Sequence, residues 1–100
     1  MTDRIWLKSY PPGVPADIDP TQYPSLVALM DEAFHRYAPR VAYSFMGRDI
    51  TFAETEALSR ALAAYLQGLG LSKGDRVAIM MPNVPQYPVS FAAILRAGFV

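Results

Sequence analysis

The hydrophobic pattern of residues 68–100 predicts the elements around which the chain is organised. The run Val77–Met81 is continuously apolar; a glycine-rich turn precedes it, and a polar break and a second apolar segment, Val89–Ala97, follow. A strand that is covered on both faces has such a run, as in the parallel sheets of α/β proteins. The apolar pattern resumes at Phe99 and Val100. We therefore expect an α/β fold that contains a helix over Val89–Ala97 and the start of a parallel βαβ unit.

Two earlier stretches show the 3.6-residue period of amphipathic helices. The first helix is expected over residues 25–37, with Ser25 as its N-cap. The second begins at the capping-box pattern of Thr51 and Glu54 and runs to about Gln67. We expect the core-facing stripe of the second helix to be Ala57, Leu58, Ala61, Leu62, Tyr65, Leu66 and Leu69.

A β-hairpin is predicted between these two helices. Residues 41–46 alternate with the period of two that is typical of a strand, and residues 49–52 return as the second arm. Gly47 and Arg48 suit a two-residue loop with a type II′ turn. No catalytic constellation lies in this stretch, so we interpret the hairpin as scaffold.

Residues 1–24 are predicted to be an irregular, proline-rich segment that precedes a folded part over residues 25–100. Prolines recur along this segment, where they fix φ and remove backbone donors. Trp6, Leu7 and Tyr10 are too apolar for a free tail, so we expect them to anchor the segment as it wraps over the folded part. A proline-rich ligand for the aromatic groove of a partner is the alternative interpretation.

Composition indicates a piece of a larger protein. The chain is 52% apolar and 18% charged, against about 25% charged in an ordinary domain, so we expect further chain to cover its apolar faces. Nine basic side chains balance nine acidic ones, which excludes the basic footprint of nucleic-acid binding. The sequence has no cysteine, no secretory signal and no apolar run long enough to span a membrane. We therefore expect a cytoplasmic protein.

Few residues are candidates for chemistry. The glycines at 68, 70 and 74 follow a helix and precede a strand, the reverse of the order that phosphate binding needs. The single histidine, His35, has no zinc-like ligand spacing around it, so we expect no metal site and no catalytic residue. Open α/β sheets bind ligands at the carboxyl ends of their strands, which makes Asn83, Gln86 and Tyr87 the candidate substrate-binding residues. Turn and capping roles are the structural alternative for these three.

Taken as a set, residues 49–100 resemble the N-terminal part of the long-chain fatty acyl-CoA synthetases, of the adenylate-forming superfamily. That family has a T-[FY]-x-E helix start, then G-[LV]-x-K-G-D-R-V-A-[IL]-M-x-P-N, an aromatic-containing helix and A-G. The matching residues are Thr51, Phe52, Glu54, Gly70, Lys73, Gly74, Asp75, Arg76, Val77, Ala78, Met80, Pro82, Asn83, Gln86, Tyr87, Ala97 and Gly98. The opening WLKSYPPGVPADID resembles the bacterial long-chain branch, so the resemblance covers nearly the whole chain.

The resemblance implies that residues 25–100 are a truncated N-terminal part of an AMP-binding domain, in a fatty acid–CoA ligase. Such enzymes use ATP and Mg²⁺ to form an acyl-adenylate and then transfer the acyl group to the thiol of CoA. The family's phosphate loop, adenine-binding segment, magnesium-coordinating glutamate and mobile lysine would all lie beyond Val100. We therefore expect the 100 residues alone to be inactive and to bind none of these cofactors.

The alternative function is a stand-alone module that binds a lipid or a protein without catalysis. If the chain is instead part of a ligase, the isolated piece is expected to self-associate through the surfaces that carry Met80 and Phe91. The partners implied for the full-length enzyme are fatty acid, ATP and CoA, with no nucleic acid. Peripheral association with the inner face of the membrane is a further hypothesis.

Overall fold

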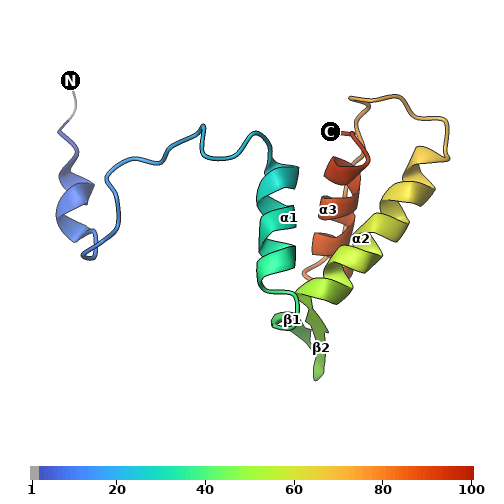
Figure 1. Ribbon diagram of the computed structural model, residues 1–100, viewed down its shortest axis with the longest axis horizontal. Helices are drawn as coiled ribbons and strands as arrows, with labels where there is room; N and C mark the ends of the chain where they lie inside the picture. Colours follow the sequence, from blue (N-terminus) through green and yellow to red (C-terminus); the bar gives the residue numbers. More distant parts are fainter. Residues whose placement is uncertain (1–2) are drawn as a thin grey trace.

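Three helices and a β-hairpin make up the folded part of the computed structural model, which describes residues 3–100. The elements are η1 (Ile5–Ser9, a 3₁₀-helix), α1 (Leu26–Arg36), β1 (Val41–Phe45), β2 (Arg48–Thr51), α2 (Phe52–Gln67) and α3 (Gln86–Arg96). Helix α2 packs along α3, and α1 contacts both (Figure 1). The hairpin lies where α1 ends and α2 begins. The predicted set of three helices and one hairpin is therefore confirmed.

Both predicted N-caps are present. Ser25 Oγ accepts a hydrogen bond from the backbone N–H of Ala28 at 3.1 Å. Thr51 Oγ1 accepts from the N–H of Glu54 at 3.1 Å, and Glu54 Oε2 accepts from the N–H of Thr51 at 2.9 Å. These bonds satisfy N–H groups that have no partner inside the helix. Local sequence thus sets the first residues of α1 and α2.

The core lies between α2 and α3 and consists mainly of small side chains. Its buried members are Ala63, Ala93, Ile94, Ala97 and Phe99. On α2, the side chains of Thr55 and Ser59 are also fully buried. Their hydroxyls donate to the backbone carbonyls of the N-cap Thr51 and of Glu56, at 2.8 and 2.7 Å. Because these hydroxyls are satisfied locally, their burial leaves no unpaired polar group.

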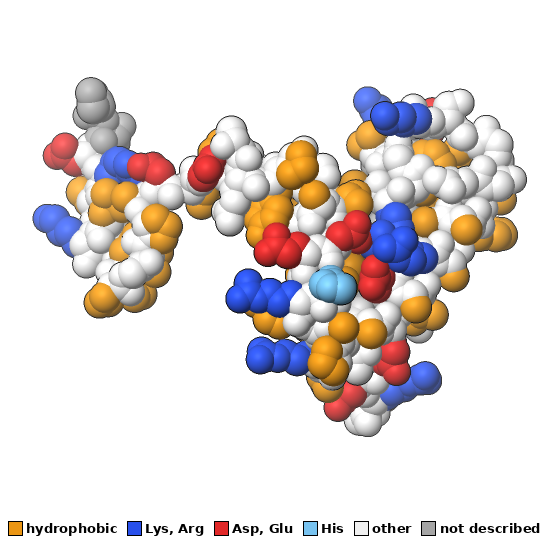
Figure 2. Space-filling view, in the orientation of Figure 1, with side chains coloured by type: hydrophobic (Ala, Val, Ile, Leu, Met, Phe, Trp, Pro, Cys, Tyr) orange, Lys and Arg blue, Asp and Glu red, His pale blue; other side chains and the backbone are white. Residues whose placement is uncertain are grey.

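The buried face of α2 is therefore only partly the predicted one: Leu62 and Leu66 of the predicted stripe pack against the core, but most of its other members do not. Leu58 and Tyr65, which belong to the predicted stripe, are 50% and 65% exposed. The face with Thr55, Ser59 and Ala63 packs instead, because these small side chains allow α2 to lie close to the alanines of α3. Larger apolar side chains remain at the surface, and Figure 2 shows such side chains over all parts of the visible face.

The turn of the hairpin also differs from the prediction. Phe45 pairs with Arg48, so the two-residue loop is Met46 and Gly47 rather than Gly47 and Arg48. Both loop residues have positive φ, 49° and 78°, as a type I′ turn requires. Glycine stands second in this loop, whereas the type II′ interpretation placed it first. The second strand consequently starts one residue earlier than expected, at Arg48.

The predicted strand Val77–Met81 has no regular ladder along its length, but its start is paired with the end of the chain. The N–H of Val77 donates to the carbonyl of Val100 at 2.8 Å, and the N–H of Val100 donates to the carbonyl of Asp75 at 2.9 Å. Asp75 and Val77 thus both bond Val100, and two alternate residues of one strand that bond the same residue of its neighbour are the pattern of a parallel ladder. The start of a βαβ unit is thus present.

Residues 77–81 are not covered on both faces, contrary to the prediction. Val77 and Ile79 are partly buried against the core, whereas Ala78 and Met80 are exposed. The prediction fails because, within residues 3–100, no element lies over the outer face of this stretch.

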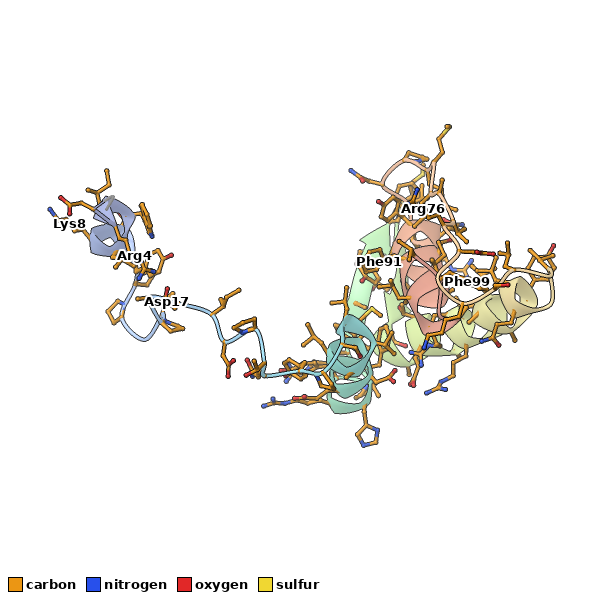
Figure 3. The ribbon with its side chains drawn as sticks, turned by 90° about the horizontal axis from the view of Figure 1, so that it is seen from above. Arg4, Lys8, Asp17, Arg76, Phe91 and Phe99 are labelled. Atoms are coloured by element: carbon orange, nitrogen blue, oxygen red, sulfur yellow. The ribbon has the colours of Figure 1, made fainter. Side chains whose placement is uncertain are left out.

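The N-terminal segment extends away from the helices instead of wrapping over them (Figure 1). It is closed on itself by Arg4, whose guanidinium donates to both carboxylate oxygens of Asp17 at 3.2 and 2.6 Å and to the carbonyl of Ala16 at 2.7 Å (Figure 3). We call residues 4–17 the N-terminal clasp. Of the three residues expected to act as anchors, Trp6 and Tyr10 are 47% and 40% exposed, and Leu7 is partly exposed. The prediction that the segment wraps over the folded part is wrong, because a local ion pair rather than contact with the core holds the segment. The segment also contains η1, which was not predicted.

Candidate binding grooves beside the hairpin

Two adjoining grooves lie between the hairpin and the loop of residues 82–88. The smaller one, of about 320 Å³, is lined by Tyr43, Ser44, Phe45, Asn83, Val84, Pro85, Tyr87 and Pro88. The larger one, of about 860 Å³, is lined by Phe45, Arg48, Asp49, Ile50, Glu54, Ala57, Leu58, Val84, Pro85, Gln86 and Val89. Because Phe45, Val84 and Pro85 line both, the grooves form one continuous surface feature.

All three predicted substrate-binding residues lie at these grooves. Asn83 and Tyr87 line the smaller groove, and Gln86 lines the larger one. The loop is held by backbone bonds from the N–H of Val84 to the carbonyl of Pro82 and from the N–H of Tyr87 to the carbonyl of Val84, at 2.9 and 3.0 Å. Helix α3 starts at Gln86, earlier than predicted, so Gln86 and Tyr87 lie in its first turn.

The hairpin side of the grooves was not anticipated. Arg48 and Ile50 from β2 and Leu58 from α2 line the larger groove. Nothing in the residue types of the hairpin marks a site, because only the tertiary fold brings the hairpin to the loop before α3. The one local signal is Leu58, a large apolar residue on the face of α2 that turns away from the small-residue core.

The carboxylates at the larger groove already have structural partners. Asp49 accepts a hydrogen bond from the hydroxyl of Ser44, and Glu54 caps α2. Arg48 makes no ion pair within residues 3–100. The lining is otherwise largely apolar. This arrangement can bind an apolar or amphipathic group, but it contains no positioned nucleophile or acid–base pair.

Within residues 3–100, neither a cluster of metal-ligating side chains nor a glycine loop that opens a helix is found. Across residues 3–100, no three His, Cys, Asp or Glu side chains come together in a way that could hold a metal ion. Gly68, Gly70 and Gly74 follow α2, and the next helix starts only at Gln86, so their amides do not lead into a helix N-terminus. In the same part of the chain, no helix combines the length and the apolar character needed to cross a bilayer.

Comparison with known proteins identifies the family. Residues 30–100 match the family described as "AMP-binding enzyme". This chain belongs to the AMP-binding enzyme family. It is similar to the long-chain-fatty-acid–CoA ligases of Yersinia pestis and Salmonella typhimurium, with 54% and 56% identity over 98% and 97% of its length. The chain spans only about 18% of the length of these curated relatives.

A solved structure supports the same family at the level of the fold. The structure described as the Klebsiella oxytoca NpsA N-terminal subdomain aligns with a TM-score of 0.72 and 37% identity. The alignment covers 76% of this chain and 20% of that one. The α/β interpretation and the resemblance to adenylate-forming enzymes are thus confirmed, whereas the ligand role of Asn83, Gln86 and Tyr87 stays a prediction.

Proposed function

We propose that these residues are the N-terminal part of a long-chain fatty acid–CoA ligase, which activates a fatty acid with ATP and Mg²⁺ and transfers the acyl group to CoA. The observation that carries this proposal is the identity of 54–56% to curated long-chain-fatty-acid–CoA ligases over nearly the whole chain. Because the described residues hold neither a metal cluster nor a phosphate loop, ATP, Mg²⁺ and CoA would be bound by the rest of the protein. The 100 residues alone would be inactive.

Asn83, Gln86 and Tyr87 are proposed to contact the substrate in the complete enzyme. Their loop follows residues 77–81, at the end where α/β enzymes hold ligands. The largely apolar linings of both grooves suit an alkyl chain better than a nucleotide. No step of the chemistry is assigned to these side chains.

Enzyme assays of two polypeptides test this function. The complete natural polypeptide is expected to convert palmitate and CoA to palmitoyl-CoA in the presence of Mg-ATP, with release of AMP and pyrophosphate. Failure to form a CoA thioester from fatty acids of any chain length would overturn the proposal. The 100-residue chain is expected to show no turnover and no saturable calorimetric isotherm with Mg-ATP; a saturable isotherm would contradict its predicted inactivity.

A stand-alone binding module is the second candidate, and the exposure of Met80, at 98%, favours it. The two candidates differ in the size of the native polypeptide. On an immunoblot with antibody to residues 25–100, a band several-fold larger than this chain supports the ligase, and a band at its own size supports the module. Fractionation of the same cells tests the proposed cytoplasmic location with peripheral membrane binding: most of the band should be soluble, and high salt should release the remainder from membranes.

A further inference from the structure

We propose that Arg36, Tyr37 and Arg40, at the C-terminal end of α1, form a binding site for a phosphate group, which we call the arginine site. The inference goes beyond the proposed function and does not rest on it. The site is separate from both grooves, since none of its three residues lines either of them.

Two guanidinium groups are held against the same aromatic ring. The guanidinium carbon of Arg36 lies 5.5 Å from the centre of the Tyr37 ring, and that of Arg40 lies 5.3 Å from it. Both distances are in the range of a cation–π contact. The two charges are therefore no further apart than the sum of these distances, although like charges repel. Figure 2 shows basic side chains near the histidine, His35, at this end of α1.

The ring between the two guanidiniums is itself fixed by packing. The Tyr37 ring lies 5.8 Å from the ring of Phe52 on α2, and Phe52 packs in turn on the buried Phe34. The backbone of Arg40 is bonded on both sides: its N–H donates to the carbonyl of Tyr37 at 2.8 Å, and its carbonyl accepts from the N–H of Phe52 at 3.0 Å. A site that is positioned before its ligand arrives loses less entropy on binding.

No carboxylate within residues 3–100 forms an ion pair with Arg36 or Arg40. The ion pairs of the described residues involve three other arginines, Arg4, Arg60 and Arg96. Glu32, one helical turn before Arg36, interacts with Tyr23 and raises the pKa of that hydroxyl, chiefly through a hydrogen bond. Glu54 of α2 caps its own helix. The two guanidiniums therefore carry positive charge without a paired counter-ion, which attracts an anion.

A phosphate group fits two guanidiniums better than a single carboxylate does. Each guanidinium offers parallel N–H donors, and a phosphate has enough oxygens to accept from both groups at once. A carboxylate has two oxygens, and one guanidinium already uses both in the bidentate arrangement. Both arginines are exposed, so their ends can turn toward a shared ligand. The headgroup of an anionic phospholipid and a soluble phosphate compound both provide this chemistry.

Titration of the complete natural polypeptide with inorganic phosphate, followed by calorimetry at constant ionic strength, tests the site. Arg36→Gln combined with Arg40→Gln is expected to weaken a saturable component of binding at least about tenfold. Lysine at both positions should weaken it as well, because lysine keeps the charge but lacks the planar fork of donors. The matched control, Lys73→Gln with Arg76→Gln, removes two exposed positive charges elsewhere and should leave binding unchanged.

Three results would overturn the arginine site. Equal weakening by the control variant, or full binding by the lysine variant, would show that general positive charge attracts the phosphate without a built site. Binding that the glutamine variant does not change would place the phosphate elsewhere on the protein. If this variant also unfolds at a lower urea concentration, carboxylates from the rest of the polypeptide occupy the two arginines.

Sedimentation with lipid vesicles distinguishes the two sources of phosphate. If the ligand is a lipid headgroup, the complete protein should sediment with vesicles of phosphatidylcholine and phosphatidylglycerol more than with phosphatidylcholine alone, and the glutamine variant should lose this difference. Phosphate binding that depends on Arg36 and Arg40, without such a difference between the vesicles, assigns the site to a soluble phosphate compound.

Discussion

At the scale of single residues, the ion pair between Arg96 and Asp31 is the contact that ties α3 to α1. A guanidinium nitrogen of Arg96 donates to Asp31 Oδ1 at 2.7 Å, and the two side chains are 11% and 42% exposed. The Nε of Arg96 is buried and has no acceptor in the described residues. The other two ion pairs of these residues lie within α2 and within the N-terminal clasp, so neither joins two helices. Removal of Asp31 would leave a largely buried charge without its partner.

Asp31→Ala is therefore expected to lower the free energy of unfolding by about 1–3 kcal/mol, measured by urea denaturation. Arg96→Met should cost less, because it removes the buried unpartnered Nε together with the charge. Glu56→Ala is the matched control: it breaks the ion pair with Arg60 along α2, and such exposed pairs contribute about 0.5 kcal/mol or less. If Asp31→Ala and Glu56→Ala lowered the free energy of unfolding by the same amount, the burial of Arg96 would have no effect on stability.

At the scale of elements, the sequence predicted the features that depend on nearby residues, such as helix caps. It did not predict the features that depend on packing against another element, such as the buried face of a helix. The caps at Ser25 and Thr51 depend on residues at most three positions away, and both are present. The buried face of α2 depends on the side chains that α3 presents to it. Because these are mainly alanines, the face of α2 with the small residues Thr55 and Ser59 packs against them. A stripe of larger apolar residues cannot reveal this preference, because hydrophobic periodicity carries no information on how closely a partner helix approaches.

The N-terminal clasp is an element that no pattern in the sequence predicted. Its stability is expected to depend on pH. Hydrogen bonds from Arg4, and its positive charge, lower the pKa of Asp17 below the ordinary aspartate value. Because the clasp favours the carboxylate, its ion pair is fully formed above the ordinary value and is lost as the pH falls below about 4. The fluorescence of Trp6, the single tryptophan, should report this loss, since Arg4 lies 6.0 Å from its ring.

Asp17→Asn provides the control for this titration. The substitution removes the charge that Arg4 pairs with, so the low-pH change in Trp6 fluorescence should disappear. Hydrogen bonds from Thr21 also lower the pKa of Asp19, and Asp19 still titrates in this variant. The difference between the two proteins therefore isolates the fluorescence change that is due to Asp17. Superimposable pH profiles of the two proteins would show that the ion pair does not hold the clasp.

At the scale of the whole molecule, the shape of the grooves could not be derived from residue patterns. Asn83, Gln86 and Tyr87 could be predicted as candidates because their position after an apolar run has a general meaning in α/β folds, and all three line the grooves. Their partners on the hairpin were not, because residues 45–58 approach the loop only through the packing of α2 on α3. The apolar composition did anticipate one global property: large side chains at the surface, which further chain would cover.

The same exposed side chains predict that the isolated 100-residue chain self-associates. Met80 and Phe91 are 98% and 41% exposed, and apolar surface left open in this way favours association by burial. Light scattering should show a mass that rises with concentration. Met80→Glu and Phe91→Glu should each shift this rise to higher concentration, whereas Met46→Glu, at the exposed tip of the hairpin, should not. A monomer at every concentration would exclude these surfaces as interfaces, and an equal effect of all three variants would indicate nonspecific charge repulsion instead.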